Sequence, residues 1–156
     1  MTEEQKQFVL ERLIPSVECE EGRGFDMKVW IEKWGEYVEE GHNRDLRTRP
    51  SCGTVCCLGG LIESLVAATC LHPLSFREAG KVIGLNPAQS RILFDENIFW
   101  PQPYRSQWMS AFTPGEKAAV AVALLKEVVR TNAAILVPSD DYEDALLVRM
   151  EKYDRR

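Results

Sequence analysis

Three of the five cysteines lie within one short stretch, residues 51–60, which also holds three glycines. Apolar residues recur at helical spacing over residues 54–68, so the sequence predicts a helix capped by the hydroxyl of Ser51 or Thr54. Cys52 would then precede the helix, where free backbone N–H groups and the helix dipole favour a thiolate. Cys52 is therefore the candidate nucleophile of a cysteine-dependent enzyme. The alternative for all three thiols is the usual fate of free cysteine, a small buried apolar residue.

A polar loop, residues 41–50, leads directly into this stretch and carries several arginines. Helix N-termini bind anions through free N–H groups, and glycine lets a ligand approach the backbone closely. Arginine adds bidentate contacts to phosphate or carboxylate groups. We therefore predict a site for a small anionic ligand formed by Arg47, Arg49, Cys52, Gly53 and Thr54. The alternative is a solvated loop with scattered charges.

The same region contains the residue types of a zinc site, in His42, Cys52, Cys56 and Cys57. Their spacing matches no common zinc motif, and adjacent cysteines on a helix point about 100° apart. We predict no metal site and no cofactor. The sequence also lacks the motifs of phosphate-binding loops, dinucleotide-binding folds, zinc proteases and paired catalytic carboxylates. A non-enzymatic binding or interaction protein, with a partner protein or a small anion as ligand, is favoured over an enzyme.

Motifs along residues 24–132 carry a family resemblance. They are Phe25-Asp26-Met27, the run from Cys52 to Gly60, Gly84-Leu85, Leu93-Phe94, Trp100-Pro101 and Thr113-Pro114. In these the chain resembles a loose group of small uncharacterised proteins of bacteria and their phages, which carry a Cys-Gly-Thr-x-x-Cys-x-x-Gly signature. The resemblance implies an α-helical domain associated with phages or mobile elements, and it implies no activity. The chain departs from the group by extra residues before Cys52 and by Leu61 in place of an aromatic residue.

Residues 76–94 have the pattern of a helix-turn-helix, a common DNA-binding motif. Asn86 caps the second helix, which offers only Gln89, Ser90 and Arg91 for contacts with bases. Ser90 also stands where the motif needs an apolar residue. A net charge of −5 and a pI near 5.2 further disfavour nucleic acid, because a phosphate backbone attracts basic surfaces. DNA binding is therefore a secondary alternative.

The remaining pattern predicts helices. A capping box at Thr2 opens a first helix that should end before Pro15. A second helix should follow Asp26, with a stripe that is either core or a surface for stacking a ligand ring: Met27, Trp30, Ile31, Trp34 and Val38. Residues 95–104, rich in aromatics and proline, form either a packed loop or a partner surface. An Ala/Val-rich helix over residues 114–130 should be central, and an amphipathic helix over residues 140–152 packs on the domain or mediates a homodimer.

Composition sets the broad class. The chain has 156 residues, 45% hydrophobic and 28% charged, as in an ordinary globular domain. No apolar run reaches the roughly 18 residues of a membrane span, and the acidic N-terminus lacks the apolar segment of a signal peptide. Five cysteines, an odd number, fit free thiols in a reducing compartment. We therefore predict a cytoplasmic all-α protein with a single compact domain, residues 1–156, of about six to eight helices.

Overall fold

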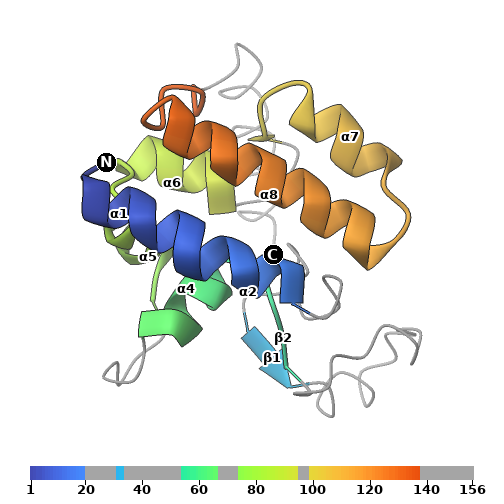
Figure 1. The fold of residues 1–156 in the computed structure, drawn as a ribbon, viewed down its shortest axis with the longest axis horizontal. Helices are drawn as coiled ribbons and strands as arrows, with labels where there is room; N and C mark the ends of the chain where they lie inside the picture. The colour runs from blue at the N-terminus through green and yellow to red at the C-terminus, as the bar shows by residue number, and fades with distance from the viewer. Residues whose placement is uncertain (20–30, 34–53, 67–73, 95–98, 138–156) are drawn as a thin grey trace, which may run out of the picture.

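The computed structural model describes residues 1–19, 31–33, 54–66, 74–94 and 99–137 (Figure 1). Helices dominate these residues, and they number six when the N-terminal helical run is counted as one. The prediction of a compact all-α fold is therefore confirmed. The predictions for the arginine-containing loop, for Cys52 and for the amphipathic helix over residues 140–152 lie outside the described residues.

The N-terminal helical run consists of three consecutive segments, α1 (Glu3–Phe8), the π-helical turn η1 (Val9–Leu13) and α2 (Ile14–Glu18). Its capping box begins at Thr2, as predicted. The predicted end before Pro15 is wrong, because the helix continues through this residue. Proline lacks the N–H that would bond to the preceding turn. The run accommodates it with a wider turn, in which the N–H of Ile14 donates to the carbonyl of Val9.

The longest helix is α8 (Pro114–Arg130), which confirms the predicted helix over residues 114–130. A capping box opens it, with the side chain of Thr113 accepting the N–H of Glu116. It ends in a left-handed residue, Asn132, at φ 53°. The N–H of Ala133 then reaches back to the carbonyl of Val128 at 2.7 Å, the pattern of a Schellman motif. The start is thus encoded by local sequence, whereas the stop also places Ala133 in the left-handed region, at φ 67°.

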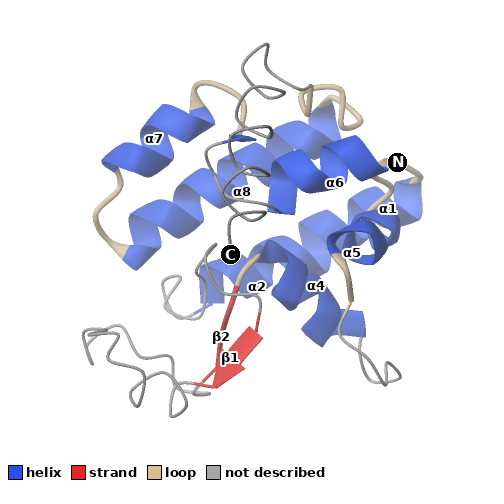
Figure 2. Cartoon of the chain, turned by 180° about the vertical axis from the view of Figure 1, so that it is seen from behind, coloured by secondary structure: helices blue, strands red, loops and turns tan. Residues whose placement is uncertain are grey.

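The other described elements are β1 (Ile31–Lys33), β2 (Thr54–Cys56), α4 (Leu58–Val66), α5 (Phe76–Val82), α6 (Pro87–Phe94) and α7 (Tyr104–Ser110). Helix α8 lies beside the N-terminal helical run, and α7 packs on the opposite side of α8 (Figure 1). Helices α4 and α5 lie together against the other side of the N-terminal run (Figure 2). Helix α8 is therefore central, as its apolar sequence predicts.

The core is one contiguous cluster contributed by all of these helices. Its largest fully buried side chains are Trp100, Phe94, Leu13, Leu58, Ile62, Ile83, Ile92, Leu93, Leu124 and Leu125. Trp100 shows that residues 99–100 of the aromatic segment pack on the body of the protein. Its indole N–H donates to the carbonyl of Leu93 at 3.1 Å, and its ring meets Trp108 edge-on at a centroid distance of 4.9 Å.

The strand pair corrects the predicted second helix. Residues 31–33 form β1, which runs antiparallel to β2, with Ile31 opposite Cys56 and Lys33 opposite Thr54. The helix predicted from the spacing of the apolar stripe is therefore wrong at residues 31–33. Aromatic and β-branched residues fit strands as readily as helices, and pairing with a distant segment decides between the two.

Two glutamines connect the start of one helix to the end of another. Gln5 accepts the N-cap N–H of its own helix at 2.7 Å and donates to the carbonyl of Lys81 at 3.4 Å, at the end of α5. Gln89 accepts its own N-cap N–H at 3.0 Å and donates to the carbonyl of Ala133 at 3.0 Å. Only an amide can both accept and donate in this way. The capping boxes that face solvent use glutamate instead, at Glu78 and Glu116.

This difference gives a testable prediction. Gln89→Glu keeps the acceptor of the capping box but leaves the carbonyl of Ala133 without its donor and facing a carboxylate. We expect the free energy of unfolding, measured by urea denaturation at neutral pH, to fall by roughly 1–3 kcal/mol. The matched control is Glu78→Gln, in a capping box with no distant carbonyl, where the loss should be clearly smaller than in Gln89→Glu. Equal losses in the two variants would contradict the bridging role of Gln89.

Candidate functional site

The predicted anion site depended on a helix that begins at Thr54, and that helix start is wrong. Thr54 lies in β2, and α4 begins only at Leu58, where the carbonyl of Cys57 accepts the N–H of Leu61 at 2.9 Å. The amide of Thr54 is therefore not one of the free N–H groups of a helix N-terminus. Two β-branched residues, Thr54 and Val55, favour the strand, and β1 supplies the pairing.

The other predicted ligands, Arg47, Arg49, Cys52 and Gly53, lie outside the described residues. A small anionic ligand held by them stays a prediction from the sequence, without the helix N-terminus that first suggested it. The reactivity of Cys52 likewise stays a prediction.

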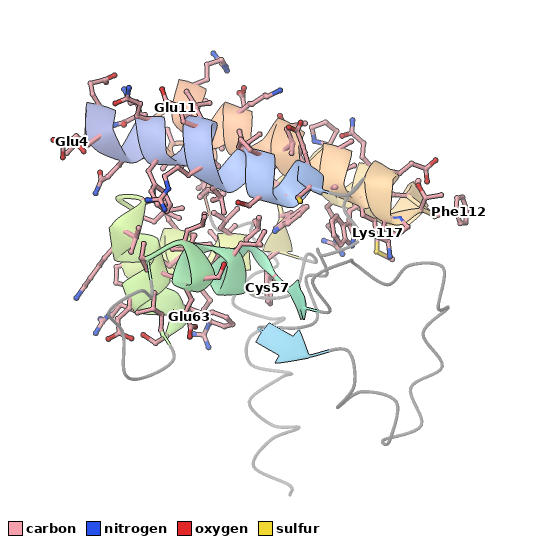
Figure 3. The ribbon with its side chains drawn as sticks, turned by 60° about the horizontal axis from the view of Figure 1, so that its bottom comes forward. Glu4, Glu11, Cys57, Glu63, Phe112 and Lys117 are labelled. Carbon is pink, nitrogen blue, oxygen red and sulfur yellow. The ribbon has the colours of Figure 1, made fainter. Side chains whose placement is uncertain are left out.

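Cys57 is a small buried apolar residue, which is the alternative predicted for the three cysteines. It is buried at the start of α4 (Figure 3), beside the buried Leu58, Gly59 and Gly60. Both glycines are therefore enclosed by neighbouring parts of the fold, as close helix packing requires. Within the described ranges, no three His, Cys, Asp or Glu side chains gather closely enough to hold a metal ion.

Helices α5 and α6 form the predicted helix-turn-helix shape, with Gly84 in the turn at φ +75°. Two of the three side chains available for base contacts are nevertheless used inside the fold. Ser90 is 1% exposed and donates to the carbonyl of Asn86 at 2.8 Å, and Gln89 donates to the carbonyl of Ala133. Of the three, only Arg91 is exposed. This arrangement fits two packed helices better than a surface that reads DNA.

Ser90 stands at its unusual position because Gly80 lies directly against it. A Cβ placed on Gly80 would lie 1.8 Å from Oγ and 2.7 Å from Cβ of Ser90. The two helices therefore meet at their closest approach where one side chain is absent and the other is small. An apolar residue larger than alanine at position 90 would therefore crowd against Gly80.

The most exposed large apolar side chains in the described part of the chain were not identified from the sequence. Phe112 is 91% exposed and Met109 is 69% exposed, at the junction of α7 and α8. We call these two residues the apolar corner. Figure 3 shows Phe112 projecting away from one end of the molecule, with Lys117 nearby.

The backbone beneath the apolar corner is held in place. The N–H groups of Phe112 and Thr113 donate to one carboxylate oxygen of Glu116, at 2.8 and 2.9 Å. The N–H of Thr113 and then that of Phe112 lower the pKa of Glu116 from its ordinary value, so the carboxylate is charged at neutral pH. Below the corner, Trp108 is only 7% exposed, and Nζ of Lys117 lies 5.7 Å from the centre of its ring.

A sequence signal for this corner exists in hindsight. Phe112 directly precedes the N-cap Thr113, the place where an apolar residue commonly packs on the fourth residue of the helix as a hydrophobic staple. That fourth residue is Lys117, which offers no apolar partner. Because only one of the two positions of this staple holds an apolar residue, the pattern predicts that the ring of Phe112 is exposed.

No family model, no curated protein and no solved structure matches this chain. None of the helices in the described ranges is long and apolar enough to cross a membrane.

Proposed function

We propose that this chain is a non-enzymatic interaction protein that binds a partner protein through the apolar corner. The observation that carries the proposal is the 91% exposure of Phe112 on an anchored backbone. Burying an apolar side chain of this size stabilises a protein or a complex by about 1.5–3 kcal/mol. Phe112 and Met109 do not contribute this full stabilisation to the fold, so it is left for a complex with a partner. Aromatic residues and methionine are also enriched in the buried centres of protein interfaces.

Anchoring matters as much as exposure. A ring on a loose loop loses conformational freedom on binding, whereas Phe112 is held by the capping box of α8 and by the short connection from α7. Binding then costs less ordering entropy, so that more of the apolar gain appears as affinity. The apolar corner thus has the properties of a small, preformed anchor.

The alternative functions have less support than the apolar corner. A small anionic ligand at Arg47 and Arg49 rests on the sequence alone, as does a cysteine-dependent activity at Cys52. DNA binding through α5 and α6 is weakened because Gln89 and Ser90, two of the three polar side chains that could contact bases, are hydrogen-bonded within the fold. The association with phages or mobile elements rests on the Cys-Gly-Thr signature. A second copy of the chain is one partner that crosslinking can identify.

The test places a photocrosslinking phenylalanine analogue at position 112 in the native host cells. We expect a discrete crosslinked adduct, suppressed by excess wild-type protein but not by excess Met109→Ser/Phe112→Ser protein. The matched control carries the analogue at Leu10, which is also an exposed apolar residue but lies on the N-terminal helical run. Adducts of equal yield at both positions, or no adduct at position 112, would contradict the proposal. An adduct of twice the chain mass would identify a homodimer.

A further inference from the structure

We propose that residues 131–137 form a strained strap that opens as a unit while α8 stays folded, with Gln89 as its latch. The strap follows the C-terminal end of α8 and lies beside α6 (Figure 1). The apolar corner lies at the other end of α8, where this helix begins. The strap is therefore a separate device, and its existence does not depend on the proposed function.

Two consecutive residues of the strap have a left-handed backbone conformation, and neither of them is glycine. Asn132 has a φ of 53° and Ala133 has a φ of 67°. Asparagine tolerates this region, whereas alanine is strained there, because its Cβ lies too close to the following carbonyl oxygen. Opening releases this strain, since both residues can then return to ordinary backbone regions. The backbone of the strap therefore favours the open form.

The contacts that hold the strap closed come from its two buried residues. Ala133 is 2% exposed and Leu136 is 3% exposed. The carbonyl of Ala133 accepts the side-chain N–H of Gln89 at 3.0 Å and the backbone N–H of Leu136 at 3.1 Å. Among the described residues, the bond from Gln89 is the one hydrogen bond that joins the strap to an element other than α8. Gln89 is itself fixed by its capping box, so its amide is positioned to act as a latch.

Opening of the strap does not require α8 to unfold. The N–H groups of Asn132 and Ala133 donate to the carbonyls of Val129 and Val128, at 3.2 and 2.7 Å. These carbonyls belong to the last turn of the helix, whose carbonyls have no partner within the helix and can bond to water instead. Opening therefore exposes Leu136 and the carbonyl of Ala133 while the middle of α8 stays in the core. A ligand or partner that binds only the open form would shift the protein towards it.

Native-state hydrogen exchange of the full chain, at urea concentrations below the unfolding transition, tests the strap. The amides of Ala133 and Leu136 report on the strap, and the amide of Leu125, a buried residue of α8, reports on global unfolding. We expect the two strap amides to share one opening free energy and to exchange at least about tenfold faster than Leu125, after correction for intrinsic rates. Their exchange should respond weakly to urea, because a small opening exposes little surface, whereas that of Leu125 should rise steeply.

One variant and its control test the latch. Gln89→Glu keeps the acceptor of the capping box but removes the donor to Ala133, so exchange of both strap amides should become about tenfold faster. Glu78→Gln is the matched control, because it changes a capping box on α5 that has no bond to the strap. Since α5 stays folded when the strap opens, this control should leave the exchange of the strap amides unchanged.

A second pair of variants tests the strain. Asn132 is exposed, so neither Asn132→Ala nor Asn132→Gly removes a packed contact. Alanine is strained in the left-handed region and glycine is not. We therefore expect the strap amides to exchange fastest in the alanine variant and slowest in the glycine variant, with a difference of about fivefold or more between the two.

Each opposite result would overturn the strap. If Ala133 and Leu136 have the protection and the urea dependence of Leu125, the segment opens only when the whole protein unfolds. If Gln89→Glu speeds one strap amide and not the other, or neither, the segment does not open as a unit on release of that bond. Equal exchange in the two Asn132 variants would show that the left-handed backbone stores no strain.

Discussion

Gly80→Ala is expected to lower the free energy of unfolding by about 1–3 kcal/mol, although alanine is ordinarily the better helix former by about 1 kcal/mol. The new methyl group would lie 1.8 Å from Oγ of Ser90, far inside van der Waals contact. Ser90 cannot turn away easily, because its hydroxyl is bonded to the carbonyl of Asn86 and its side chain is buried. The helices α5 and α6 must therefore separate, which opens the core between them. Urea denaturation measures the loss.

A compensating substitution makes this prediction specific. Ser90→Gly removes both atoms that the new methyl group would meet, and the next nearest atom, Cβ of Leu85, lies at an ordinary 3.6 Å. The Gly80→Ala/Ser90→Gly double variant should therefore be more stable than either single variant, with a coupling free energy of about 1–3 kcal/mol. Simple additivity of the two losses would show that the contact between residues 80 and 90 does not limit the approach of the helices.

The parts of the fold that the sequence predicts well are those set by neighbouring residues. The capping box at Thr2 opens α1 as predicted, and boxes at Ser75 and Thr113 open α5 and α8 in the same way, because each box needs only a hydroxyl and a carboxylate or amide three residues later. The length of α8 follows from its apolar run and its capped start. These signals operate within one helical turn, so distant parts of the chain do not change them.

The mispredicted parts depend on distant partners. Helical spacing around Ile31 and a hydroxyl at Thr54 each indicated a helix, but the two segments pair as strands across residues that separate them widely in sequence. Pro15 indicated a helix end, but burial of Val9, Leu13 and Val17 along one side favours a continuous helix with one wider turn. In each case tertiary contacts outweigh a local preference, which is below about 1 kcal/mol for Ile31 or Thr54 and about 3 kcal/mol for Pro15.

The candidate site shows the same limit. The sequence drew attention to Cys52 and its neighbours because thiols, glycines and arginines have strong chemical signals. It gave no such signal for Met109 and Phe112, whose significance comes only from being left outside the core. An apolar residue is exposed when no other part of the chain packs over it, and local sequence patterns do not show this. The exception is the staple at Phe112, where Lys117 stands at the position of the apolar partner.

Trp100 is a buried side chain that contacts two different helices. It is 2% exposed, donates to the carbonyl of Leu93 near the end of α6, and meets Trp108 of α7 at an interplanar angle of 70°. The ring of Trp108 in turn carries Nζ of Lys117 of α8 at 5.7 Å from its centre. Trp100 therefore joins α6 to the α7–α8 hairpin by apolar contact and by a hydrogen bond that completes a helix end.

Trp100→Ala is accordingly expected to lower the free energy of unfolding by about 3–5 kcal/mol, the range for deleting a buried aromatic side chain. Trp100→Phe keeps most of the ring contact but removes the donor to Leu93, and should cost about 1–3 kcal/mol. Urea denaturation measures both losses: the phenylalanine variant loses the N–H together with part of the indole ring, and the further loss to alanine measures the remaining ring contact. A phenylalanine variant as stable as the wild type would show that the indole N–H contributes nothing. Equal losses in both variants would show that the ring contact that phenylalanine retains contributes nothing to holding α6 against the hairpin.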